Sequence, residues 1–154
     1  MKIKMSILAL VVFFAGAIAV SAQSPHMGTW KLNEAKSRLP KGATKNHTVV
    51  YEMAGDQVKV TVDGTAGDGS AVHSEWTGKF DGKPYALTGD PAGDMRSYRM
   101  VNRRTLSLRS TKNGKLTTTA TIVVSRNGKT RTVAARSRND KGRWISSVGF
   151  YDKQ

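Results

Sequence analysis

Three histidines, His26, His47 and His73, are the side chains of this 154-residue chain best suited to acid–base chemistry or metal binding. No two of them have the spacing of metal ligands, and the chain has no cysteine, so the sequence does not support a zinc site. His73 and Glu75 share one face of a predicted strand, where they could form a general acid–base pair. That face lies opposite Trp76, so we interpret His73 and Glu75 as an exposed pair. From the spacing of the histidines we expect no metal site.

Motifs for nucleophilic or phosphate chemistry are missing from the sequence. No serine lies in a Gly-x-Ser-x-Gly elbow. A loop that cradles phosphate needs several glycines close together, whereas the glycines of this chain are spread over the predicted hairpins. Most carboxylates lie in predicted turns, where they cap the local backbone: Asp56, Asp68, Asp81, Asp90, Asp94 and Asp140. We therefore expect a protein that is not an enzyme and that uses no cofactor.

Aromatic side chains and two arginines are the residues best able to bind a ligand. In the segment 95–101, MRSYRMV, Arg96 and Tyr98 share one face of the predicted strand. Arg99 lies on the opposite face. Either face would bring an arginine inward, and a buried arginine needs an anionic partner. The predicted ligand-binding residues are Tyr51, Trp76, Arg96, Tyr98, Arg99, Trp144 and Phe150. For each aromatic residue the alternative is that it simply fills the core.

The segments that carry these residues are short and separated by turn signals such as AGD, DGK, KNGK and RNGK, as in an all-β protein. Strands are predicted near 27–32, 47–53, 57–63, 70–80, 84–88, 95–101, 104–111, 116–125, 129–138 and 143–152. Only 33–46 has room for a helix, which Pro40 would end after one or two turns. We expect a single antiparallel up-and-down β-barrel of about 8–10 strands, with at most a short helix after the first strand, because closure removes exposed strand edges.

Alternation along the strands predicts which side chains face the core. Four inward faces are predicted: Val58, Val60 and Val62; Val72, Ser74, Trp76, Gly78 and Phe80; Leu116, Thr118, Ala120, Ile122 and Val124; and Trp144, Ser146, Val148 and Phe150. Small residues among them would leave room for a cavity, or would equally adapt the packing to a narrow barrel.

The first predicted strand begins GTWKLN, in which Gly28-x-Trp30 resembles the Gly-x-Trp signature of lipocalins. The strand number is similar to that of the related fatty-acid-binding proteins, so the chain looks like a calycin-type barrel. It also resembles short exported bacterial proteins that begin GTWKLN and end in a strand such as FYDK. The resemblance implies a barrel that holds a small hydrophobic molecule, with Trp30 closing one end and Gly28 letting neighbouring backbone approach.

Two arginines of these families are not fixed by the resemblance. Lipocalins pack a late-strand arginine on the tryptophan, and the candidates here are Arg136, Arg138 and Arg143. Fatty-acid-binding proteins place an arginine two residues before their final tyrosine, where this chain has Gly149 before Tyr151. That anion site is therefore not implied for this chain.

Residues 1–22 have the pattern of a cleaved export signal: two early lysines, an apolar run over 6–20, and small residues before the cleavage position. The apolar run is shorter than the roughly 18 residues that normally span a bilayer. We expect cleavage after Ala22, which leaves 23–154 as one lipocalin-like β-barrel domain in the periplasm or outside the cell.

Charge is distributed unevenly along the chain. Residues 23–95 contain 8 basic and 9 acidic residues, whereas 96–154 contain 15 basic and 2 acidic ones. Such asymmetry indicates an anionic partner, although outward strand positions of a soluble barrel could also carry the excess.

Two functional hypotheses follow. The first is an exported, non-enzymatic protein that holds a small hydrophobic or amphipathic molecule in its barrel. The second is a cell-envelope protein that binds anionic lipid or glycan through the basic second half, and only this type of binding should weaken strongly as ionic strength rises. Nucleic acid fits less well with export.

Overall fold

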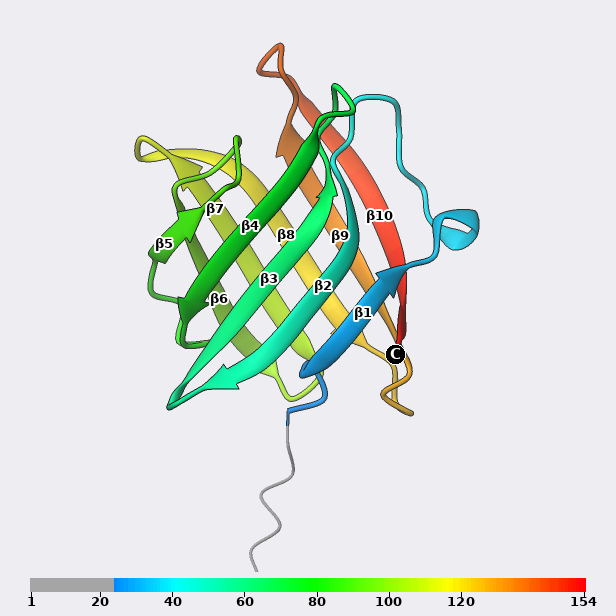
Figure 1. The fold of residues 1–154 in the computed structure, drawn as a ribbon, viewed down its shortest axis with the longest axis vertical. Coiled ribbons are helices and arrows are strands. Elements are labelled where there is room, and N and C mark those ends of the chain that lie inside the picture. The colour runs from blue at the N-terminus through cyan, green and yellow to red at the C-terminus, as the bar shows by residue number, and fades with distance from the viewer. Residues whose placement is uncertain (1–23) are drawn as a thin grey trace, which may run out of the picture.

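A computed structural model describes residues 24–154, so the predicted export signal lies outside the described residues. Ten antiparallel strands form one closed barrel in the order β1-β10-β9-β8-β7-β6-β5-β4-β3-β2 (Figure 1). The elements are β1 (Gly28–Leu32), η1 (Glu34–Lys36), β2 (Lys45–Ala54), β3 (Gln57–Thr65), β4 (Ala71–Gly78), β5 (Tyr85–Thr88), β6 (Met95–Asn102), β7 (Thr105–Lys112), β8 (Lys115–Val124), β9 (Thr130–Arg138) and β10 (Trp144–Lys153). The predictions of an up-and-down all-β barrel and of at most a short helix after the first strand are confirmed.

The barrel closes where its first and last strands meet. Trp30 of β1 pairs with Lys153 of β10, and Leu32 pairs with Tyr151. Neighbouring strands follow one another in the sequence, and several are joined by two-residue hairpins, as at Asn113 (φ 50°) and Gly114 (φ 76°) between β7 and β8. A two-residue hairpin of this kind needs positive φ at both positions, which Asn-Gly tolerates.

Three of the four predicted core faces point inward. Val60, Trp76 and Ile122 represent them, and each is at most 2% exposed. The alternation of apolar and polar residues in β3, β4 and β8 was therefore a sound guide, because each of these strands has one solvated face.

The predicted face of β10 is wrong. Its inward residues line the interior: Ile145, Ser147, Gly149 and Tyr151. Val148 and Phe150 instead lie on the outside, beneath the segment that follows β1. Arg38 forms a bridge with Val148, and Ser37 Oγ accepts a hydrogen bond from the backbone N–H of Phe150 at 2.9 Å. Since this segment covers the outer face, β10 carries apolar residues on both sides.

Large and small side chains are distributed unevenly inside the barrel. Tyr51, Trp76, Phe80 and Tyr98 pack together from the β2, β4 and β6 side, with the rings of Trp76 and Tyr98 4.7 Å apart. The opposite wall, formed by β8, β9 and β10, presents mostly small inner residues: Thr118, Ala120, Ala135, Ser137, Ser147 and Gly149. This asymmetry leaves unfilled space beside β8–β10.

Candidate functional site

One end of the barrel is closed by the residues that precede β1. Ser24–Met27 form a turn in which the Met27 N–H donates to the Ser24 carbonyl at 3.0 Å. His26 and Met27 are buried, and the indole Nε1 of Trp30 donates to the His26 carbonyl at 2.9 Å. This end is where β1 begins and β10 finishes (Figure 1). Trp30 itself is 0% exposed.

Gly28 allows a close approach, although by a side chain instead of backbone. A Cβ at this position would lie 2.8 Å from Cε of Lys153, and φ is +111°. The Lys153 ammonium lies 5.1 Å from the centroid of the Trp30 ring and donates to the Pro25 carbonyl at 3.3 Å. Lys153, on the C-terminal strand, thus places a cation against Trp30 at the closed end.

Arg131 of β9 is the arginine that packs on Trp30. Its Cζ lies 4.9 Å from the Trp30 ring centroid, 5.0 Å from that of Tyr51 and 4.8 Å from that of Tyr151. The candidates Arg136, Arg138 and Arg143 were therefore wrong. Two of them, Arg136 and Arg138, lie over the ring of Trp144, and all three are exposed.

The guanidinium of Arg131 is buried without a carboxylate partner. The side chain is 3% exposed, and Nε and Nη1 have no hydrogen-bond partner among residues 24–154. Its three aromatic neighbours supply cation–π attraction, but neither of these nitrogens donates to the hydroxyl of Tyr51 or Tyr151.

Tyr151 lies directly opposite Arg131 in the pairing of β9 with β10. Burial raises the pKa of Tyr151 to about 12, although the charge of Arg131 opposes the shift, so the phenol stays neutral and can donate a hydrogen bond. Gly149 makes room for this ring, because a Cβ there would lie 2.9 Å from Cε2 of Tyr151. An arginine and a tyrosine therefore meet here from two neighbouring strands.

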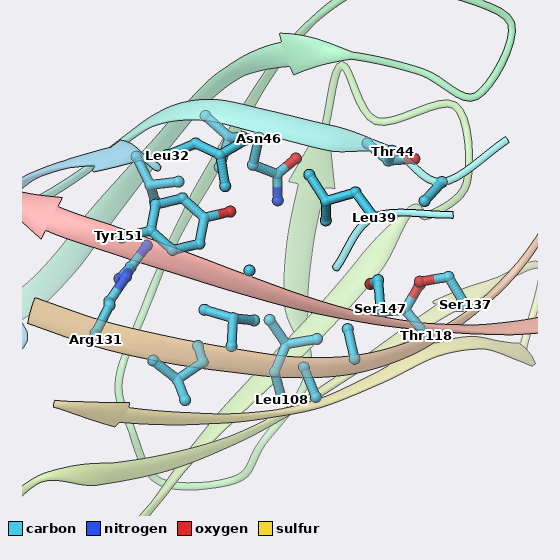
Figure 2. Close-up of a pocket in the computed structure, with 18 of the residues that line it drawn as sticks. Leu32, Leu39, Thr44, Asn46, Leu108, Thr118, Arg131, Ser137, Ser147 and Tyr151 are labelled. Atoms are coloured by element: carbon cyan, nitrogen blue, oxygen red, sulfur yellow. The ribbon is translucent and has the colours of Figure 1, made fainter. Parts of the chain in front are cut away.

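A cavity of about 110 Å³ runs inside the barrel from this pair toward the opposite end. Figure 2 shows Arg131, Tyr151 and Leu32 at one end of the cavity and the hydroxyl side chains of Thr118, Ser137 and Ser147 at the other. The wall between them is mostly apolar, with Asn46 and Arg96 as polar members beside Val49, Val62, Leu108, Ile122, Val133 and Ala135. Leu39 and Thr44, from the connection between η1 and β2, lie beside the hydroxyl end (Figure 2).

Arg96 also lines the cavity, and it has an anionic partner within the chain. Its Nη2 donates to Oδ2 of Asp90 at 3.0 Å, and its Nε donates to the hydroxyl of Ser110 at 2.8 Å. Both members of the ion pair are largely buried. The charge that was expected to need a ligand is therefore already neutralised, unlike that of Arg131.

The predicted ligand-binding residues separate into three groups. Tyr51, Arg96 and Tyr98 line the cavity. Trp76 lies in the aromatic core and donates from Nε1 to the Arg96 carbonyl at 2.9 Å. The remaining three lie on the outer surface of the barrel: Arg99, Trp144 and Phe150.

Arg131 and Tyr151 were not among the predicted ligand-binding residues. A signal for Arg131 existed, since Arg131, Val133 and Ala135 alternate along β9 and therefore share one face. Burial and the neighbouring Tyr51 raise the pKa of Tyr98 well above its ordinary value, so this phenol is neutral as well.

His73 lies on the outer face of β4, as its position opposite Trp76 predicted. Its Nδ1 is 2.6 Å from Oδ1 of Asp63 and its Nε2 is 3.7 Å from Oε1 of Glu75. The hydrogen bond with Asp63 raises the pKa of His73.

Within residues 24–154 no group of three or more His, Cys, Asp or Glu side chains is placed to hold a metal ion. Nor does any helix in this part of the chain have the length and apolarity to cross a membrane.

No protein-family model matches the sequence. No curated protein matches it. Among solved structures, the chain is similar to lobster apocrustacyanin A1, with 13% sequence identity, a TM-score of 0.43 and 86% of this chain covered. The chain spans 63% of the length of that protein.

Proposed function

We propose that this chain is an exported, lipocalin-like, non-enzymatic binding protein that holds a small amphipathic anion inside its barrel. The ligand class is a short, unbranched monocarboxylate whose carboxylate lies against Arg131. The observation that carries this proposal is the buried guanidinium of Arg131, which lines an apolar cavity and has two N–H-bearing nitrogens without a partner.

The chemistry of Arg131 favours a carboxylate over a neutral group. A buried cation without a counter-charge is costly, and a carboxylate can accept two parallel hydrogen bonds from one guanidinium. Nε and Nη1 are the unpartnered nitrogens, and the neutral phenol of Tyr151 lies across the strand pair. Binding would therefore neutralise the charge where the cavity meets the closed end.

The size of the cavity restricts the ligand further. Pockets for drug-sized molecules measure roughly 300–1,000 Å³, and an apolar cavity of roughly 150 Å³ accommodates benzene. The 110 Å³ cavity is smaller than that and thus suits a molecule of at most about six heavy atoms, which excludes long fatty acids from the interior as it stands.

Isothermal titration calorimetry with butanoate and with butanamide, its uncharged counterpart, tests this function. We expect butanoate to bind at least tenfold more tightly than butanamide, about 1.4 kcal/mol. Arg131→Met should abolish the preference. Ala135→Leu should block both ligands, because Ala135 lines the cavity, whereas Ala134→Leu is the matched control on the outer face of the same strand.

Equal affinities for butanoate and butanamide would overturn the carboxylate assignment. Absence of saturable binding to the unmodified protein, or an equal loss in Ala134→Leu and Ala135→Leu, would overturn binding in the cavity. Far-ultraviolet circular dichroism of each variant verifies that the barrel remains folded.

Export is proposed on the sequence pattern of residues 1–22. Intact-mass measurement of the protein purified from its own cells should give a chain that begins at Gln23. Such a chain keeps Ser24–Met27, which close one end of the barrel. A mass that includes the apolar leader, or one that lacks His26, would contradict the predicted cleavage after Ala22.

A further inference from the structure

The outer surface of β6–β10 is hollowed into a groove of about 700 Å³. Two rows of outward side chains cross the strands here. In the first, Arg109, Thr119, Arg136 and Ser146 are neighbours on β7, β8, β9 and β10, and in the second Arg99, Ser107, Thr121, Ala134 and Val148 are neighbours on β6 to β10. The outside of a barrel is normally convex, but apart from the arginines the side chains of both rows are short and leave a depression, which Arg99, Arg109 and Arg136 line together with them.

The arginines of this groove form no ion pair, although Asp81 stands opposite Arg99 in an isolated bridge. None of the residues that line it is acidic, and among residues 24–154 no carboxylate lies within 4.0 Å of the three guanidinium groups. The ion pairs of the described residues all fall between Glu34 and Arg96, so Arg96 is the one residue of 96–154 that takes part in them. Apart from Arg96, which is paired, and Arg131, which is buried, the basic residues of 96–154 form no ion pair that an external anion would have to displace.

The spacing of the arginines suits an anion that repeats along a polymer. Arg109 and Arg136 stand in one row with β8 between them, so their Cα atoms are about 10 Å apart, twice the strand spacing of about 4.8 Å. Arg99 is one strand and one side-chain repeat further, about 8 Å from Arg109. Three arginines spread over two rows and three strands can each bind a separate anionic group of one polymer.

We propose that this groove binds a linear acidic polysaccharide, with its carboxylate or sulfate groups on Arg99, Arg109 and Arg136. Guanidinium groups bind both oxyanions through paired hydrogen bonds. The hydroxyl side chains on the groove floor can donate to and accept from sugar hydroxyls: Ser107, Thr119, Thr121 and Ser146.

The lining of the groove disfavours the other large anions. Single-stranded nucleic acids depend on aromatic side chains on which bases stack, and none of the groove-lining residues is aromatic. Trp144 lies nearby, but Arg136 and Arg138 already contact its ring. Membrane surfaces are held by protruding apolar side chains, whereas this floor is recessed and rich in hydroxyl groups.

Binding of the full protein to a defined heparin dodecasaccharide and to oligogalacturonate tests the groove, measured by calorimetry from low to physiological salt. Replacing its three arginines (Arg99→Ser, Arg109→Ser and Arg136→Ser together) should weaken binding at least 30-fold. The control variant, with Arg103→Ser, Arg126→Ser and Arg143→Ser, removes the same charge from exposed positions at hairpin ends and should lose less than threefold. Affinity should fall steeply with salt.

Three results would overturn the assignment. Equal losses in the two triple variants would mean attraction by net charge alone. Tighter binding of oligodeoxythymidine, or of vesicles of equal phosphatidylglycerol and phosphatidylcholine, would replace the polysaccharide by that partner. If neither oligosaccharide binds in low salt, the groove is not a site for acidic polysaccharide.

The groove and the cavity are distinguished by two neighbouring residues of β9. Both border the groove, but side chains alternate along a strand, so that of Ala134 lies on the groove floor and that of Ala135 points into the cavity. Ala134→Leu should therefore weaken oligosaccharide binding at least tenfold while butanoate binding is unchanged, and Ala135→Leu should have the opposite effect. Loss of both activities in either variant would mean that the barrel has been distorted, and would contradict the independence of the two sites.

Discussion

Replacing Trp30 with alanine is expected to lower the free energy of unfolding by about 4 kcal/mol, within the 3–5 kcal/mol typical of a fully buried aromatic residue. The indole is 0% exposed, donates a hydrogen bond to the His26 carbonyl and contacts the cations of Arg131 and Lys153. Its removal would leave a void at the closed end and deprive two cations of an aromatic face. Urea denaturation followed by circular dichroism measures the loss.

Trp144→Ala is the matched control for this substitution. Trp144 lies on the outside of β10 under Arg138, whose Cζ is 4.6 Å from the ring centroid. We expect a loss of about 1 kcal/mol, in keeping with an exposed cation–π contact. Similar losses in the two variants would mean that Trp30 has no special role in closing the barrel.

The stability of the barrel is expected to fall as the pH drops from 7 to 4, with His26 as a principal cause. Burial, followed by the nearby charges of Arg131 and Lys153, lowers the pKa of His26 to about 4 from 6.5. The unfolded chain therefore takes up a proton near pH 6.5 that the folded chain accepts only near pH 4, so stability contributed by the neutral ring is lost between these values. The shift corresponds to a loss of up to about 3 kcal/mol.

Comparison of the protein with His26→Asn tests this dependence, because asparagine cannot be protonated. Urea denaturation at pH 7 and pH 4.5 should show a smaller fall in stability for the variant, and His47→Asn, which replaces a half-buried histidine of β2, is the control substitution. His73 acts in the opposite direction: its raised pKa adds stability below pH 6.5 that fades at higher pH, and it is present in all three proteins. An identical fall in the protein and in His26→Asn would contradict the role of His26.

Most of the fold could be predicted from the sequence because local signals agreed with one another. Each hairpin carries a turn signal, and β3, β4 and β8 have one wet and one dry face, so alternation identified Val60, Trp76 and Ile122 as core residues. In β10 the same reasoning failed. The segment around Ser37 covers its outer face, and a strand that is apolar on both sides gives no sign of which one points inward.

Less of the candidate site could be predicted, since it depends on how strands pair. Tyr51, Tyr98 and Arg96 were identified as large or charged residues on plausible inner faces. The meeting of Arg131 with Tyr151 arises from the register of β9 against β10, which a single sequence does not specify. Likewise, the small volume of the cavity follows from aromatic packing on the other side of the barrel, and no local pattern encodes it.

The pairing of β1 with β10 also has a consequence for how quickly the chain can fold. Trp30 and Lys153 stand opposite each other although roughly 120 residues separate them, and contacts between such distant parts of a chain carry a large loop-closure entropy and slow folding. With only this pairing missing, the other strands would form a curved sheet with two free edges, and the ring of Trp30 would lack its neighbours from β10. We expect the pairing of β1 with β10 to be the rate-limiting step of folding, so the barrel should fold slowly. Its interior would stay open to water until this pairing forms.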